Sequence, residues 1–126
     1  MRTVGYIDIE KYRCVTDNIT TNEVIITDER TQHIKEFHPG DFEIVSPFFR
    51  MVLDDPDYIL EDEDRENTGL ILKVIKSGDL RIQVVLRLHT STDPKEFKNS
   101  IISAWQIRKK EYRRLIRNKK ILYKRE

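Results

Sequence analysis

The middle of the chain reads Gly69-Leu-Ile-Leu-Lys-Val-Ile75, Lys76-Ser-Gly-Asp79 and Leu80-Arg-Ile-Gln-Val-Val-Leu-Arg-Leu88. The first and third of these segments are short and rich in β-branched and other apolar residues, which is typical of strands. The segment between them consists mainly of turn-forming residues, so the pattern predicts a β-hairpin. An antiparallel sheet is therefore the expected centre of the fold.

Further strands and helices are predicted on both sides of this hairpin. Strands are expected at residues 3–9, 23–27, 58–60 and 100–107, and helices at residues 28–38, 41–53 and 109–118. Asp28 is the expected N-cap of the first helix, and Pro39 ends it. Pro47 interrupts or restarts the second helix, whose apolar stripe is expected to contain Phe48, Met51 and Val52.

These elements predict an α+β fold. N-terminal helices pack on an antiparallel sheet of four or slightly more strands, and a basic helix closes the chain. The length of 126 residues favours a single domain over residues 1–126. The longest apolar runs are far shorter than the roughly 20 residues of a membrane span, and the N-terminus has no apolar segment of signal-peptide length. We therefore expect a soluble, cytoplasmic protein with no membrane partner.

The cysteine content excludes two kinds of site. Cys14 is the single cysteine, so an internal disulfide and a multi-cysteine zinc site are impossible. Asp54, Asp55 and Asp57 are clustered, but they lack the glycine-containing spacing of a calcium loop. We expect no metal and no cofactor.

Charge is distributed unevenly along the chain, although the formal net charge is only +1. Residues 54–66 contain eight acids and one arginine, whereas residues 108–126 contain ten bases and two acids. The acidic run is typical of a solvated face, and it could also cover the basic tail. The basic run, with Tyr112 and Tyr123 interleaved, is a candidate surface for RNA phosphates and bases, and Lys109 and Arg113 are its candidate contacts.

The first helix carries two candidate histidines. A rotation of about 100° per residue places Ile34 and Phe37 in one stripe, which we expect to be buried. Lys35 and His38, three residues apart, are neighbours along one border of this stripe, and His33 lies on the other border. Lys35 and His38 therefore form one candidate site, with His33 as a lesser candidate.

The last long strand carries a second pair of candidates. Alternation along residues 100–107 places Ile101, Ser103, Trp105 and Ile107 on one face, so that Ser103 and Trp105 stand side by side. In the hairpin, Lys73 and Arg87 lie among apolar residues. Each needs an acid or a bound anion as partner, unless it points to solvent. We take both as candidate RNA contacts.

Lys35, His38, Ser103 and Trp105 could cleave RNA if they converge. A histidine titrates near pH 6.5 and can move protons, and a lysine can stabilise charge on a phosphate. A serine hydroxyl can hold a phosphate oxygen, and a tryptophan can stack on an unpaired base. The RNA supplies its own nucleophile, the 2′-hydroxyl. Each residue also has a structural interpretation, His38 as a helix C-terminal residue and Trp105 as a core residue.

Three blocks of the sequence carry a family resemblance: residues 26–39, the segment Asp55-Pro-Asp-Tyr-Ile-Leu60, and the segment Asn99-Ser-Ile-Ile-Ser-Ala-Trp105. In this order they resemble phage-associated members of the Barnase–EndoU–colicin–RelE nuclease superfamily. Within it, the site looks most like that of colicin D, a tRNA nuclease. The resemblance lies in a lysine three residues before a histidine, matched by Lys35 and His38, and a Ser-x-Trp, matched by Ser103 and Trp105.

The resemblance implies a toxin-like, metal-independent endoribonuclease that acts on tRNA or another structured RNA. His38 would be the general acid/base, Lys35 would stabilise the phosphorane, Ser103 would hold the phosphate, and Trp105 would support or stack. The products would be a 2′,3′-cyclic phosphate and a 5′-hydroxyl. An immunity or inhibitor protein would be a further partner. The alternative is a non-catalytic RNA- or protein-binding phage module on the same scaffold.

Overall fold

The computed structural model describes residues 1–126. Seven strands are formed by Arg2–Tyr6 (β1), Glu23–Ile26 (β2), Tyr58–Glu61 (β3), Thr68–Ile75 (β4), Leu80–Arg87 (β5), Asn99–Ile107 (β6) and Ile121–Lys124 (β7). The α-helices are Ile9–Tyr12 (α1), Asp28–Phe37 (α2), Asp41–Val45 (α3), Phe49–Asp54 (α4) and Lys109–Asn118 (α5), and two 3-10 turns are Ser46–Phe48 (η1) and Lys76–Gly78 (η2). None of the helices combines the length and apolar character needed to cross a membrane.

All strands belong to one sheet with the order β1-β2-β6-β5-β4-β3-β7. Neighbouring strands are antiparallel except β2 and β6, which are parallel. The predicted α+β class and the basic C-terminal helix are confirmed, but the sheet is larger than predicted and mixed. The additional size comes from β1 and β2 at one edge and β7 at the other. β1 and β2 were predicted as strands but not as part of this sheet, and β7 was not predicted as a strand.

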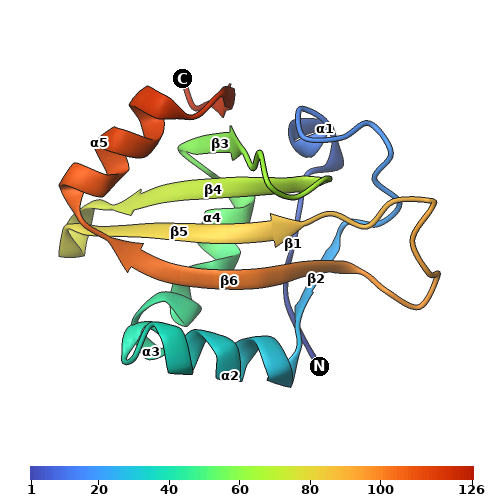
Figure 1. Cartoon of the computed structure of the whole chain (residues 1–126), viewed down its shortest axis with the longest axis horizontal. Coiled ribbons are helices and arrows are strands. Elements are labelled where there is room, and N and C mark those ends of the chain that lie inside the picture. Colours follow the sequence, from blue (N-terminus) through green and yellow to red (C-terminus); the bar gives the residue numbers. More distant parts are fainter.

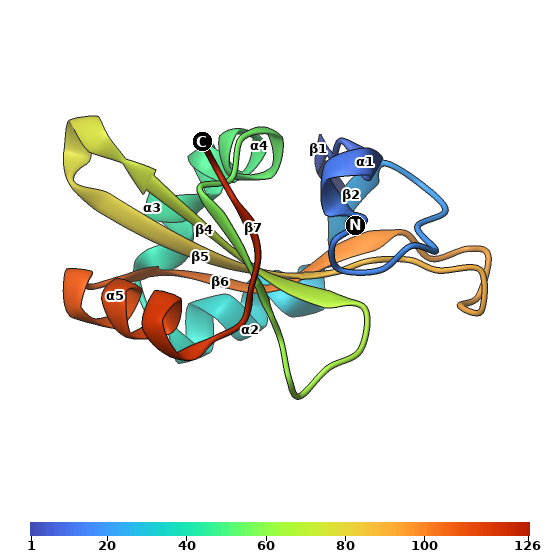
Figure 2. The ribbon, with the colours of Figure 1, turned by 90° about the horizontal axis from the view of Figure 1, so that it is seen from above.

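The helices cover the sheet from two sides (Figures 1 and 2). On the side of α4, the larger core contains Val52 and Leu53 together with Ile59, Ile71 and Val84 of the sheet. On the side of α5, Leu115 packs on a smaller core that contains Leu60, Leu70, Leu72 and Val85. α2 runs along the outer side of β6 (Figure 1). We refer below to the two sides as the α4 face and the α5 face.

Several predicted boundaries near the N-terminus need correction. The strand predicted at residues 3–9 ends at Tyr6, because Asp8 caps α1 and accepts a hydrogen bond from the Glu10 N–H at 3.1 Å. Thr27, rather than Asp28, is the N-cap of α2, and its hydroxyl accepts from the Arg30 N–H at 3.1 Å.

The helix predicted at residues 41–53 is divided into α3, η1 and α4. The 3-10 turn over Ser46-Pro47-Phe48 changes the phase of the helix. Phe49, Val52 and Leu53 are therefore the buried residues of α4, whereas Met51 is 47% exposed. The predicted stripe of Phe48, Met51 and Val52 was right only for Val52 and, in part, for the half-buried Phe48.

Lys73 lies on the α4 face, where it is 7% exposed. Its ammonium group is 3.2 Å from Asp55 and 3.5 Å from Asp57, and Arg125 of the C-terminal segment reaches the same Asp55 at 3.0 Å. Part of the acidic run thus pairs with the basic tail, as the sequence allowed. The partner that a lysine in an apolar strand requires is an acid within the fold, so the expected contact of Lys73 with RNA has no support in these surroundings.

Candidate active site

A β-bulge in β6 determines which residues share the α5 face. Leu86 is paired with Ile101 and Val85 with Ser103, so Ile102 is an extra residue in the strand. Ile101 therefore joins the core on the α4 face, opposite Ser103, and the prediction that the two share a face was wrong. The bulge also brings Ser100 onto the same face as Ser103 and Trp105.

Three cross-strand rows of β4, β5 and β6 form the middle of the α5 face. Arg87, Ser100 and Trp105 are half-buried, and the other side chains of these rows are buried. Neighbouring rows are two residues apart along β4 and β5, or about 6.8 Å. The rows are Thr68–Arg87–Ser100, Leu70–Val85–Ser103 and Leu72–Gln83–Trp105.

His38 lies against Trp105, which belongs to the third of these rows. It is the C-cap of α2, and its backbone N–H donates to the Ile34 carbonyl at 2.8 Å. The following Pro39 disfavours helical geometry at this position, so the chain leaves the helix here. The His38 ring is stacked on Trp105 with a centroid distance of 4.5 Å and an interplanar angle of 4°. The expected meeting of the helix end with the strand is thus present for this pair.

Asp41 holds the end of α2 against β6. Its backbone N–H donates to the His38 carbonyl at 3.0 Å, and its carboxylate accepts from the Gln106 N–H at 3.2 Å and from the Gln106 side-chain amide at 3.1 Å. Beyond Ser100, β6 has no neighbouring strand on this side. The Asp41 carboxylate therefore pairs with a backbone donor at the free strand edge and holds α3 and His38 beside Trp105.

Ser103 carries a buried hydroxyl without a partner. The residue is 7% exposed, and its Oγ is the one buried side-chain polar atom that lacks a hydrogen bond. Buried polar groups are nearly always paired, because an unpaired one has lost its hydrogen bonds to water. This orphaned donor lies in the row next to Trp105 and is a candidate for holding a ligand oxygen.

The two other candidates on α2 lie apart from this centre. Lys35 is exposed and its ammonium is 5.4 Å from the centroid of the Phe42 ring, with no hydrogen bond or ion pair to His38 or Ser103. The His33 ring contacts Phe37 at a centroid distance of 4.6 Å. Phe37 is 66% exposed, so the predicted buried stripe contains Ile34 but not Phe37. α2 lies beside the sheet, and only a narrow strip of it is covered.

A cleft of about 920 Å³ opens at the other end of the α5 face. Its lining includes Arg87, Ser100 and Ile102 of the sheet, Arg30 of α2, and Asp93 and Phe97 of the loop before β6. None of Lys35, His38, Ser103 and Trp105 is among its lining residues. The cleft and the His38–Trp105 pair are therefore separate features of one face, with Ser103 between them.

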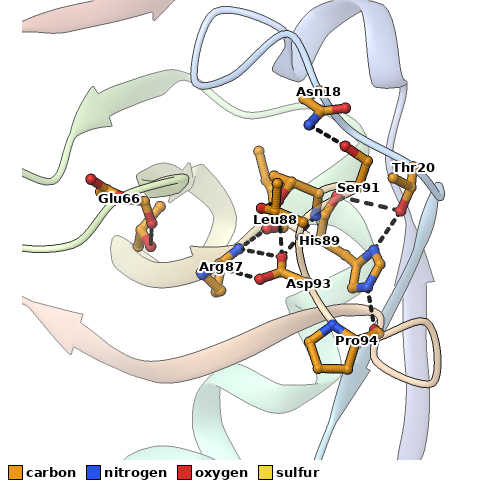
Figure 3. Close-up of polar contacts among 12 residues, drawn as sticks. Asn18, Thr20, Glu66, Arg87, Leu88, His89, Ser91, Asp93 and Pro94 are labelled. Carbon is orange, nitrogen blue, oxygen red and sulfur yellow. Dashed lines mark hydrogen bonds and ion pairs between the residues drawn. The ribbon is translucent and has the colours of Figure 1, made fainter.

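Sequence reasoning missed His89, which organises the loop between β5 and β6 (Figure 3). Its Nε2 donates to the Pro94 carbonyl at 2.7 Å, and its Nδ1 contacts the Thr20 hydroxyl at 2.5 Å. Asn99 accepts from the His89 N–H and donates to the Thr21 carbonyl, both at 2.7 Å. Both ring nitrogens are occupied, so His89 is a structural histidine. The position of His89 directly after a predicted strand was the one feature of the sequence that could have indicated this role.

Arg87 is paired within the same loop. Its guanidinium donates to Asp93 at 2.9 Å and 3.1 Å and also to the Leu88 carbonyl. Donation from the Thr90 N–H, together with the Arg87 guanidinium, holds the pKa of Asp93 below its usual value. The acid that Arg87 requires is thus Asp93, which remains ionised at neutral pH.

The basic helix α5 exposes most of its charge. Lys109 and Arg113 are exposed and form no ion pair, whereas Arg114 is paired with Glu111 at 2.7 Å. Tyr112 is half-buried against Tyr58, and burial, more than the nearby Asp57, raises its pKa to about 12. The exposed bases, and not this tyrosine, are available to a partner. No group of three or more His, Cys, Asp or Glu side chains is arranged to hold a metal ion.

Comparison with known proteins identifies a family. The model of the phage-Barnase-EndoU-ColicinE5/D-RelE like nuclease2 family matches residues 1–124. No curated protein and no solved structure matches the chain.

Proposed function

The chain belongs to the family of phage-Barnase-EndoU-ColicinE5/D-RelE like nucleases, and on this basis we propose that it is a metal-independent endoribonuclease that cleaves tRNA or another structured RNA. The observation that carries the proposal is the His38–Trp105 stack beside the buried, unpaired Ser103 hydroxyl. A histidine and an orphaned donor on one face of the sheet are suited to proton transfer next to a bound phosphate.

The proposed reaction uses the RNA's own 2′-hydroxyl. His38 accepts its proton while the 2′-oxygen forms a bond to phosphorus, and the bond from phosphorus to the 5′-oxygen breaks. The imidazolium then returns the proton to that 5′-oxygen. The products are a 2′,3′-cyclic phosphate and a 5′-hydroxyl, and no bond is formed to the protein.

The other residues of the site orient the His38 ring or bind the phosphates of the RNA. Trp105 fixes the plane of the His38 ring through the stack. Ser103 donates a hydrogen bond to a non-bridging phosphate oxygen. Because its Oγ is buried, the side chains that cover it must move when the RNA binds. The exposed Lys35 moves from Phe42 toward the phosphate and stabilises the phosphorane. The flanking RNA is contacted by Arg87, His33, Lys109 and Arg113. The exposed lysine and arginine side chains of α5 that form no ion pair favour a structured RNA with several phosphates within reach.

Cleavage in EDTA tests this function. Purified protein is incubated with total tRNA and with a single-stranded RNA, and the ends of the products are identified by mass spectrometry. We expect 2′,3′-cyclic phosphate and 5′-hydroxyl ends, and no cleavage at a site whose ribose lacks the 2′-hydroxyl. Salt-sensitive binding without products would instead support the non-catalytic module.

Ser103→Ala separates the proposed role of Ser103 from a structural one. No hydrogen bond is lost in this variant and a buried unpaired polar atom is removed, so the free energy of unfolding should stay equal or rise by up to about 1 kcal/mol. The rate of cleavage should fall by about tenfold or more, because the phosphate loses a donor. Urea denaturation and single-turnover cleavage measure the two effects. Loss of stability together with unchanged cleavage would contradict the proposed role.

A further inference from the structure

Arg87 has donors that the protein leaves unused. A guanidinium has five N–H donors. Two of them form the end-on pair with Asp93, and a third reaches the Leu88 carbonyl. The Nε–H and the second hydrogen on Nη2 remain, and they lie side by side on one edge of the guanidinium. The structure records no partner for this two-donor fork, and the Arg87 side chain is 33% exposed at the cleft.

The fork is held rigidly by the loop before β6. Asp93 accepts from the Thr90 N–H at 2.8 Å and from the Thr90 hydroxyl at 3.2 Å, in addition to both bonds from Arg87. The His89 ring bonds to Pro94 within the same loop, and its contact with Thr20 ties the loop to the N-terminal part of the chain (Figure 3). An arginine that is already fixed loses little side-chain entropy when it binds. The loop therefore presents a ready-made fork.

The neighbours of Arg87 suit a single phosphate. Ser100 lies opposite Arg87 on β6, and its hydroxyl forms no hydrogen bond within the protein. Arg30 of α2 also lines the cleft and forms no ion pair. Two parallel N–H donors match the geometry of a phosphate. The carboxylates of Glu29, Glu66 and Glu96 in the same lining oppose a polyphosphate.

The row that contains Arg87 is next to the row that contains Ser103. The two rows are about 6.8 Å apart, which is comparable to the spacing of successive phosphates in an extended RNA strand. We propose that Arg87, positioned by Asp93, binds the RNA phosphate adjacent to the one that is cleaved, and that the cleft receives the nucleotide attached to it. The inference rests on the proposed function, because Ser103 defines the cleaved phosphate. Asp93 is a positioning residue and does not touch the RNA.

Single-linkage neutralisation tests this assignment without cleavage. The full chain with His38→Ala is titrated with a short fluorescent RNA in which one phosphate at a time is replaced by an uncharged methylphosphonate. Replacement at one linkage should raise Kd about tenfold. With Arg87→Ala added, the unmodified RNA should bind about tenfold more weakly, and the same replacement should have no further effect. The slope of log K against log salt should fall by about 0.7.

Three further variants define the mechanism. Arg87→Lys keeps the charge but loses the two-donor fork. It should therefore lose most of the discrimination at that linkage, by which we mean the preference for the charged phosphate over the methylphosphonate. Asp93→Asn removes a negative charge beside the RNA, which by itself favours RNA binding. It should still weaken this preference, because the guanidinium is no longer fixed. Arg50→Ala removes an exposed charge on α4 and is the matched control, which should leave discrimination unchanged. Thermal melting of each variant shows that it is folded.

The outcomes separate the two proposals. Cleavage by the unmodified protein locates the cleaved linkage, and the Arg87-dependent linkage should be its direct neighbour. Cleavage without any Arg87-dependent linkage, or with one several nucleotides away, would overturn the assignment of Arg87 and leave the nuclease intact. An Arg87-dependent linkage in a protein that cleaves no RNA would overturn the proposed function and support a phosphate-binding cleft.

Discussion

His38→Ala should reduce RNA cleavage by about 10²–10⁴-fold, the usual contribution of a general acid/base. The proposed reaction has one proton carrier on this face, and alanine cannot accept the proton of the 2′-hydroxyl. His38 lies at the end of α2, is only half-buried and forms no side-chain hydrogen bond, so the fold should persist. Single-turnover cleavage in EDTA measures the rate, and circular dichroism melting measures the stability.

Variants of His33 and Trp105 are the comparisons for this result. His33→Ala removes the neighbouring histidine on the same helix, which contacts Phe37 and not Trp105, and it should reduce the rate far less. Trp105→Phe retains an aromatic ring beneath His38 and should retain more activity than Trp105→Ala. Full cleavage by the His38→Ala protein would remove the basis of the proposed mechanism, whatever the effect of the other variants.

Asn99→Ala should destabilise the protein by about 2–5 kcal/mol. The side chain is completely buried at the start of β6, where it accepts from the His89 N–H and donates to the Thr21 carbonyl. Alanine leaves the buried His89 N–H and the part-buried Thr21 carbonyl unpaired. A buried unpaired group costs about 1–3 kcal/mol, and the part-buried one costs less. Urea denaturation with the free energy extrapolated to water measures the change.

Asn18→Ala is the matched control for this prediction. Asn18 also bonds to the loop between β5 and β6, through the Ser91 hydroxyl at 2.7 Å, but this contact is exposed to solvent. Its loss should change the free energy of unfolding by less than about 0.5 kcal/mol. If Asn99→Ala were equally mild, water would be able to replace Asn99, and the loop would not be the rigid support that Arg87 requires.

Local patterns predicted the long elements well. The hairpin of β4 and β5 and the helix α5 lie within a residue or two of the predicted positions. Their apolar period, turn residues and charges are properties of neighbouring residues, so the sequence contains the required information. The short strands β1, β2 and β7 depend on partners distant in the chain. Their pairing was predicted poorly because a segment of four or five residues has little pattern of its own.

The candidate site was predictable only in part. His38 and Trp105 could be named from the sequence, and the structure stacks them. The position of Phe37 could not be predicted, since it depends on α2 lying beside the sheet with one narrow strip covered. The bulge at Ile102 has no sequence signature here, yet it moves Ile101 into the core and places Ser100 beside Ser103.

Sequence alone was enough to predict the α+β class, the central hairpin and the basic helix, because these follow from interactions between residues close in the chain. It also supplied the histidine, serine and tryptophan that nuclease chemistry requires. The folded structure was needed to learn that Lys73 pairs with acids inside the fold and that Arg87 keeps two free donors at a cleft. Burial and partner choice depend on which distant segments pack together, and residue spacing does not specify that packing.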